Sequence, residues 1–258
     1  MFSNMKIWTL SDLHLSFGTP NKNMDVFGDK WLHHPEKIKE NWLRLVRNED
    51  LVLIAGDISW GLKQGEVLPD LAWINLLPGT KLMSKGNHDL WWKSASKVRA
   101  MLPPSIHIIH NDAFTINGVT IGGARLWDHP DLNYYKYIDV KEIQGVRIKK
   151  KEYTNTVVMH DRKIFKNELD RLSWSLDAMD KSARHKILMV HYPPIPPDRS
   201  DNEFSRLIKD AGIDICIYGH LHNLYLDAPV NFEKDGTKYF CTACDYLDFT
   251  PMLLLDVK

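Results

Sequence analysis

Residues 51–57 read Leu-Val-Leu-Ile-Ala-Gly-Asp, an apolar run that ends in a glycine and a carboxylate. Five apolar residues bounded by a turn signal are typical of a buried strand, and Gly56 permits the sharp turn that follows. Similar apolar runs followed at once by polar side chains occur at 6–14 (KIWTLSDLH), 81–89 (KLMSKGNHD), 187–191 (ILMVH) and 214–222 (DICIYGHLH). We therefore predict five strands whose carboxyl ends all deliver polar side chains to loops, which is where α/β sheets bind ligands.

Helical patterns alternate with these strands. They begin at Pro35, cover 92–101 and 162–179, and resume at Ser200–Glu203, which we interpret as a capping box opening a helix that Gly212 closes. Further strands are predicted at 106–109, 113–116, 119–123, 238–241 and 252–257, with a hairpin turn at Asn117-Gly118. Alternating strands and helices predict an α/β fold with mixed sheets covered by helices, in a single domain over 1–258.

Residues 128–160 interrupt this alternation. They have no clean hydrophobic period and are rich in Tyr and Lys, so we predict an insert or cap beside the core. The basic run at 147–151 within it is interpreted as a solvated face.

Composition excludes several classes of protein. Over 258 residues, 33 Lys and Arg balance 33 Asp and Glu, so no long-range basic field favours nucleic acid as a partner. Three cysteines do not form a disulfide framework, and Cys241 and Cys244 are expected to be buried, neutral thiols. We see no signal peptide and no apolar run long enough to span a bilayer. The expectation is a cytoplasmic protein that has no membrane partner.

The side chains at the strand ends determine the expected chemistry. They comprise two Asp, one Asn and at least four His, and no Cys. Oxygen and imidazole ligands favour first-row divalent ions such as Mn, Fe, Zn, Ni or Co over metals that prefer thiolates. The set is too large for one tetrahedral zinc ion, whereas two metal ions sharing a bridging carboxylate would use all of it.

The ordered motifs DLH, GD, GNHD, a lone His and GHLH resemble the calcineurin-like metallophosphoesterase superfamily over residues 12–222. One such motif is weak evidence, but five in order, each closing a predicted strand, are specific. The resemblance implies a four-layer α/β/β/α sandwich and hydrolysis of a phosphate mono- or diester, the substrate expected here being a small molecule. It also implies two divalent cations, of which we favour Mn, and in-line attack by a hydroxide bridging them.

The resemblance further implies a role for each residue at the strand ends. Seven side chains would bind metal: Asp12, His14, Asp57 and His222 the first ion, and Asp57, Asn87, His191 and His220 the second. His88 would assist the leaving group as a catalytic residue, and Asp89 would orient its imidazole.

Two alternatives remain open at this stage. The same fold could serve as a protein-binding scaffold without catalysis, or the chain could be a nuclease or nucleotide pyrophosphatase of the same superfamily. The oligomeric state and the physiological substrate cannot be read from the sequence. We also hypothesise that some of the tryptophans near the motifs line the substrate pocket together with Tyr192, namely Trp60, Trp91, Trp92 and Trp127.

Overall fold

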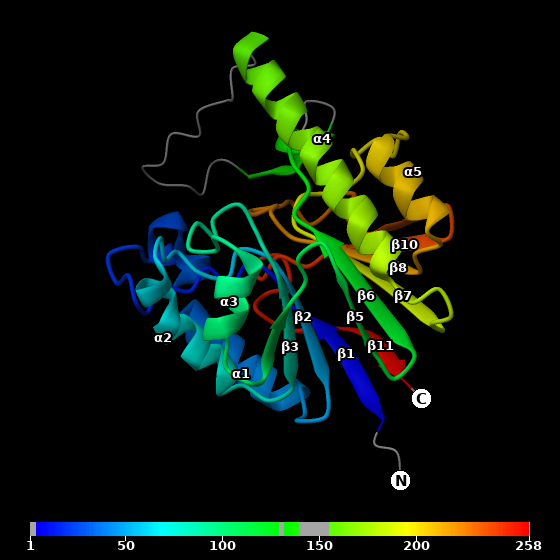
Figure 1. The fold of residues 1–258 in the computed structure, drawn as a ribbon. Helices are drawn as coiled ribbons and strands as arrows, with labels where there is room; N and C mark the ends of the chain where they lie inside the picture. Colours follow the sequence, from blue (N-terminus) through cyan, green and yellow to red (C-terminus); the bar gives the residue numbers. More distant parts are fainter. Residues whose placement is uncertain (1–3, 129–131, 140–154, 258) are drawn as a thin grey trace.

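Two mixed β-sheets lie face to face in the computed structural model, which describes residues 4–128, 132–139 and 155–257 (Figure 1). The five-stranded sheet has the order β11-β1-β2-β3-β4. Its strands are β1 Met5–Thr9, β2 Leu51–Ala55, β3 Thr80–Ser84, β4 Ile106–Ile108 and β11 Met252–Val257. Only β11 pairs antiparallel, so β1 to β4 all present their carboxyl ends to the same edge.

The six-stranded sheet has the order β5-β6-β7-β8-β10-β9. Its strands are β5 Ala113–Ile116, β6 Val119–Ala124, β7 His185–Val190, β8 Ile215–Tyr218, β9 Phe232–Lys234 and β10 Thr237–Cys241. The central strands β6, β7, β8 and β10 are parallel, and an antiparallel strand closes each side. The predicted strands are confirmed within a residue or so at their ends, and β9 is an additional one.

Alternation along the strands explains why the sheets are buried on both faces. Leu51 and Leu53 of β2 pack against Ile187 and Met189 of β7 in a core between the sheets. The intervening residue Val52 points the other way, into the core under the helices. Because side chains alternate across a sheet, a wholly apolar strand such as β2 supplies both cores at once.

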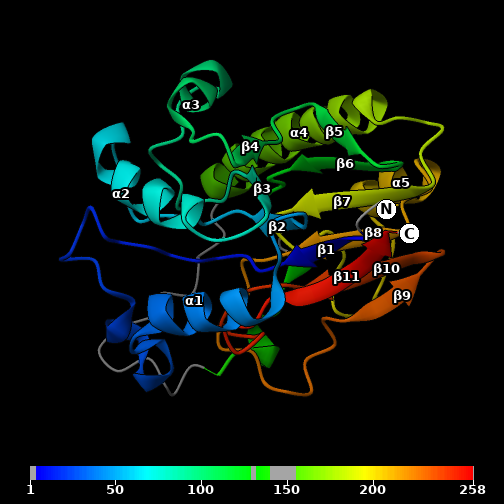
Figure 2. The same ribbon diagram turned by 90° about the horizontal axis from the view of Figure 1, so that it is seen from below.

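Helices cover the two outer faces, which confirms the four-layer α/β/β/α arrangement (Figure 2). Those over the five-stranded sheet are α1 His34–Leu45, α2 Gln64–Asn75 and α3 Ala95–Met101. Those over the six-stranded sheet are α4 Asn155–Ala178 and α5 Glu203–Asp210. Short 3-10 helices occupy Met24–Phe27, Asp29–Trp31 and Tyr135–Tyr137. None of the helices in the described ranges is both long and apolar enough to cross a membrane.

Two helices differ from the sequence prediction. Helix α2 is an additional helix that was not predicted, and it contains Pro69, which removes a backbone hydrogen bond from the helix interior. Burial of Val67, Leu71 and Ile74 in the core outweighs that loss. The predicted capping box at Ser200–Glu203 is wrong: Asn202 caps α5, and its reciprocal partner is Ser205.

The predicted insert at 128–160 lies mostly outside the described residues, so it stays a prediction, as does the single domain over 1–258. The predicted end of the insert at 160 is wrong, because helix α4 already begins at Asn155 rather than at the predicted 162. The part at 132–139 contacts the loop after β8. Asp139 N donates to Asn223 O at 2.7 Å, and Tyr225 N donates to Tyr137 O at 2.9 Å. This part of the chain therefore lies directly beside the GHLH motif.

Candidate metal centre

The loops at the carboxyl edge hold four of the predicted ligands in left-handed backbone. The φ angles of Asp12, His14, Asp57 and His220 are 58°, 45°, 51° and 70°. Each such residue costs about 1–3 kcal/mol and persists only where surrounding structure fixes it, which is common at functional sites. Here Asp12 N donates to Gly56 O at 3.0 Å and His14 N donates to Asp57 O at 3.0 Å, tying the first two loops together.

Glycines in the motifs allow the backbone to approach these side chains closely. A Cβ on Gly86 would lie 2.1 Å from Asp57 Oδ1, and one on Gly219 would lie 2.0 Å from Asp12 Oδ2. Real Cβ atoms essentially never make such short contacts. The glycines of GNHD and GHLH are therefore required by the packing of the carboxylates against neighbouring loops.

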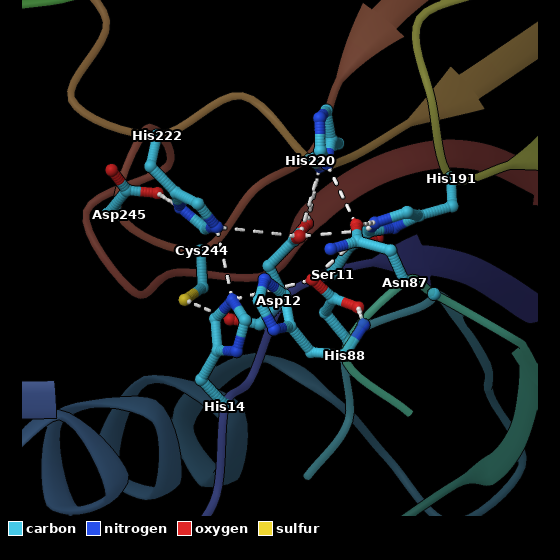
Figure 3. A network of polar contacts seen from close by, with 12 residues as sticks. Ser11, Asp12, His14, Asn87, His88, His191, His220, His222, Cys244 and Asp245 are labelled. Carbon is cyan, nitrogen blue, oxygen red and sulfur yellow. Dashed lines mark hydrogen bonds and ion pairs between the residues drawn. The ribbon is translucent and has the colours of Figure 1, made fainter. Parts of the chain in front are cut away.

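The first group of converging side chains contains Asp12, His14 and His222 (Figure 3). His14 Nε2 lies 3.1 Å from His222 Nε2, which in turn lies 3.6 Å from Asp12 Oδ1. His14 Nε2 also lies 3.7 Å from Asp57 Oδ2. Behind His222, Asp245 Oδ1 accepts a hydrogen bond from Nδ1 at 2.8 Å, which directs Nε2 toward the other ligands.

The second group is built on Asn87, His191 and His220 (Figure 3). Asn87 Oδ1 lies 2.6 Å from His191 Nε2 and 3.0 Å from His220 Nδ1. Asp57 Oδ2 lies 3.5 Å from His191 Nε2. All four side chains predicted for the second ion therefore lie together. They come from the ends of strands β2, β3, β7 and β8.

The chemistry of these contacts fits cation ligands. His191 Nδ1 donates to Ala55 O at 2.9 Å, because a carbonyl oxygen only accepts, so a neutral ring has a lone pair at Nε2. Burial lowers the pKa of His191 to about 3, which keeps the ring neutral. That lone pair then faces Asn87 Oδ1, a second acceptor. Two facing acceptors are what a shared cation requires.

Asp57 lies between the two groups. Its Oδ1 accepts from His88 N at 2.8 Å, and its Oδ2 faces both His14 and His191. Asp57 and Asp12 are almost fully buried, and burial raises the pKa of both carboxyls. In the described part of the chain their ion pairs are all with histidines. Two buried carboxylates with no permanent cation favour a bound metal ion as the compensating charge.

His88 faces this centre from the loop after β3. Its ring lies 5.5 Å from the His14 ring and 4.4 Å from the Trp60 ring, measured between centroids. Burial lowers the pKa of His88, although the Asp57 charge opposes that effect. The neutral ring therefore predominates at pH 7.

The predicted role of Asp89 is wrong. Its carboxylate is fully buried and accepts hydrogen bonds from four other groups: Ile58 N, Ser59 N, Gly86 N and the Trp91 indole. None of these partners is the His88 imidazole. Asp89 instead holds the GD and GNHD loops in a fixed relation, because it bonds the backbone of both.

The hypothesis that tryptophans line the substrate pocket is wrong for Trp91 and Trp92 and stays a prediction for Trp60 and Trp127. Trp91 and Trp92 are buried in the core, away from any pocket. Trp60 stacks on His14 at 5.0 Å and contacts His88. Trp127 lines a pocket together with Tyr192 and the ligand candidate His220.

The sequence reasoning missed Asp245, which follows strand β10. It lies at the same carboxyl edge as the other ligands, so the rule that found them would have found it too. Cys241, which ends the same strand, and Cys244 are buried thiols as predicted, and burial raises their pKa values. Cys244 Sγ donates to Asp12 O at 2.9 Å and so supports the first loop.

Comparison with known proteins assigns the family. The model of the calcineurin-like phosphoesterase family matches residues 5–224. The Gene 66 proteins of Mycobacterium phages D29 and L5 are 36% identical over 83 residues and 34% identical over 84 residues. These matches cover 32% of this chain and only 40% and 39% of the two phage proteins.

A solved structure shows the same fold. Phosphopantetheinyl hydrolase from Mycobacterium tuberculosis superposes with a TM-score of 0.56 at 14% identity, over 99% of this chain and 97% of that one. The family match extends over most of the chain, including every candidate ligand from Asp12 to His222. The chain therefore belongs to the calcineurin-like phosphoesterase family.

Proposed function

We propose that the protein hydrolyses a small-molecule phosphate mono- or diester at a centre of two divalent cations. The family and the converging ligands support a metal-dependent phosphohydrolase. The observation that carries the dinuclear assignment is Asp57, whose Oδ2 faces His14 on one side and His191 on the other. One oxygen directed at two separate groups of nitrogens is what a bridging ligand requires.

Assignment of ligands follows from the contacts. Asp12, His14, Asp57 and His222 would hold one ion, and Asp57, Asn87, His191 and His220 the other. Once bound, the two ions would acidify a water molecule for in-line attack at phosphorus and neutralise charge on the phosphate. The oxygen and imidazole ligands accept several first-row ions, and cellular supply decides which of them is bound. Among these ions we favour Mn.

His88 would act on the leaving group. With a lowered pKa its ring is neutral, so it donates a hydrogen bond from a ring N–H to the ester oxygen. Negative charge on the bound phosphate raises the pKa of the ring and favours proton transfer as the bond breaks. Trp60 holds the ring in place by direct contact.

Substrate and location complete the proposal. Zero net charge argues against nucleic acid, and the pocket lined by Trp127, Tyr192 and His220 suits a small organic group. Free thiols at Cys216, Cys241 and Cys244 suit a reducing compartment such as the cytoplasm.

The test combines metal analysis with turnover. We expect about two Mn per chain, and hydrolysis of p-nitrophenyl phosphate or bis-p-nitrophenyl phosphate that stops on addition of chelator. Asp57→Asn should abolish turnover and weaken both ions, whereas Asp227→Asn on the exposed loop after GHLH is the matched control. Two ions without turnover of any phosphate ester would favour a scaffold, and absence of metal after incubation with Mn²⁺ would refute the dinuclear centre.

A further inference from the structure

A second polar pocket lies beside the metal centre, where the ends of β3 and β6 meet helix α4. Its cavity is about 160 Å³. Four cationic side chains line it, namely Lys85, Lys93, Arg125 and Arg171, and the lining carboxylate is Glu168. We call this the basic pocket. A water molecule occupies about 30 Å³ in the liquid, so the cavity accommodates a ligand several times larger.

The cations of the basic pocket are only partly compensated. Arg125 Nη2 donates to Glu168 Oε1 at 3.1 Å, and Arg171 Nε lies 3.6 Å from the same oxygen. Lys85 Nζ donates to the Trp92 carbonyl at 3.0 Å, a neutral partner. One carboxylate oxygen thus serves two guanidinium groups, which leaves a net positive cavity that favours an anion.

Unused hydrogen-bonding atoms also line the cavity. Ser84 Oγ and Glu168 Oε2 are buried and have no hydrogen-bond partner. Buried polar atoms are rarely left unpaired, because each costs about 1–3 kcal/mol. His110 also lines the cavity. Its pKa is lowered by burial and then by the charge of Arg171, so its ring is neutral at pH 7.

A ligand that satisfies all of these groups must accept from several cations and from Ser84, and must also donate to Glu168. Inorganic phosphate does both at neutral pH, because it keeps a P–OH group. Sulfate has no proton to donate. A phosphomonoester has lost its second proton above a pKa of about 6 and is mostly a dianion without P–OH.

We propose that the basic pocket binds inorganic phosphate, with Lys85, Lys93, Arg125 and Arg171 holding its anionic oxygens and Glu168 accepting from its P–OH. This site is separate from the seven candidate metal ligands, none of which lines the cavity. The ion is a product of phosphomonoester hydrolysis, so on the proposed function the pocket would hold a product of the reaction. The binding itself does not require hydrolysis by this chain.

Calorimetric titration of the chelator-treated full-length chain with sodium phosphate at pH 7.5 and constant ionic strength tests this. We expect about one phosphate per chain, at least tenfold tighter than sulfate. The double substitution Lys93→Gln and Arg171→Gln should weaken phosphate binding at least tenfold. The same change of charge at the exposed α4 residues Arg162→Gln and Lys163→Gln should leave it unaltered. Lys93→Gln alone, at an exposed position, is the second variant if the double one does not fold.

The role of Glu168 has its own test. Glu168→Gln should narrow the ratio of phosphate to sulfate affinity, because an amide can donate to sulfate. Glycerol phosphate binding as tightly as inorganic phosphate would overturn the choice of ligand and assign the pocket to an organic phosphate.

Two other results would overturn the site itself: no saturable binding to the metal-free chain, or equal binding by the Lys93→Gln, Arg171→Gln variant. Phosphate that binds only with Mn²⁺ and is lost in Asp57→Asn would belong to the metal centre. Because the titration is done without metal, a failure of the proposed phosphoesterase activity would leave its outcome unchanged.

Discussion

Replacing Asp245 by Asn should change how the affinity for Mn²⁺ depends on pH. Asp245 Oδ1 accepts from His222 Nδ1 at 2.8 Å, and its Oδ2 accepts from Asn223 N at 2.8 Å. Burial opposes protonation of His222, but the Asp245 carboxylate prevails and raises its pKa to about 9. A protonated ring has no lone pair for a metal, so an ion must displace this proton.

The size of the effect follows from that pKa. At pH 7 about one His222 ring in a hundred is neutral, which lowers the apparent Mn²⁺ affinity roughly a hundredfold relative to pH above 9. The affinity of the wild-type protein should therefore rise about tenfold per pH unit on account of this group. In Asp245→Asn burial is opposed only by the charges of Asp12 and Asp57, so the pKa of His222 falls and the dependence of the Mn²⁺ affinity on pH becomes weaker. At a pH where His222 is neutral in both proteins, loss of the Asp245 carboxylate should weaken Mn²⁺ binding by the variant about 10–100-fold.

Competition with a metal-indicator dye between pH 6.5 and 8.5 measures both effects. The two proteins should bind Mn²⁺ with similar affinity near pH 7, and the affinity of the wild type should rise more steeply, by up to about a hundredfold relative to the variant over the two units. Asp227→Asn, at an exposed position on the loop that carries His222, should follow the wild type. Parallel pH profiles for the wild type and Asp245→Asn would refute the argument that Asp245 controls the protonation of His222.

Two further predictions concern catalysis and stability. His88→Asn should keep two ions bound but lower kcat about 10²–10⁴-fold, with a smaller loss for p-nitrophenyl than for alkyl esters; equal losses for both would contradict leaving-group assistance. Burial raises the pKa of Asp70 to about 6, although Ser59 and the Phe17 N–H donate to its carboxylate. Stability is therefore lost as pH rises from about 4 to 6, and Asp70→Asn should stabilise the fold by up to about 3 kcal/mol at pH 7.5 and about half of that at pH 5. Urea unfolding at the two pH values checks this, and a gain that does not change with pH would contradict it.

The strands and the candidate ligands could be predicted because both are local features of the sequence. A run such as 51–55 is apolar at every position, which only a strand buried on both faces explains economically. Polar side chains directly after such runs must lie at the carboxyl edge of a parallel sheet. The order of the motifs indicates the family, and the match of the family model confirms it.

Helix α2 and the cap of α5 were beyond this reasoning. Pro69 is unfavourable in a helix interior by local rules, and only the burial of Val67, Leu71 and Ile74 against the sheet compensates for it. Asn202 rather than Ser200 caps α5 because its side chain also donates to Pro194 O at 2.9 Å, a contact with the preceding loop. In both cases tertiary contacts outweigh local preference.

The partners of the acidic side chains were likewise decided by the tertiary structure. Asp89 is next to His88 in the chain, yet its carboxylate turns away to bond Ile58 N, Ser59 N, Gly86 N and the Trp91 indole. Asp245 lies 23 residues beyond His222 and is the residue that orients it. The side chains of neighbouring residues can point in different directions, and a hydrogen bond forms only between groups with the right distance and angle. Proximity in the sequence therefore does not predict these partners.

What the sequence determined by itself was the set of buried strands and the polar groups at their ends, because hydrophobic period and turn residues act over a few positions. What only the tertiary structure decided was how two sheets bring those groups together. Asp12 and Asp57 from one sheet meet His191 and His222 from the other, and Lys85 and Arg125 meet Glu168 of α4 at the basic pocket. These contacts depend on how elements far apart in the sequence pack against one another, so no local sequence pattern predicts them.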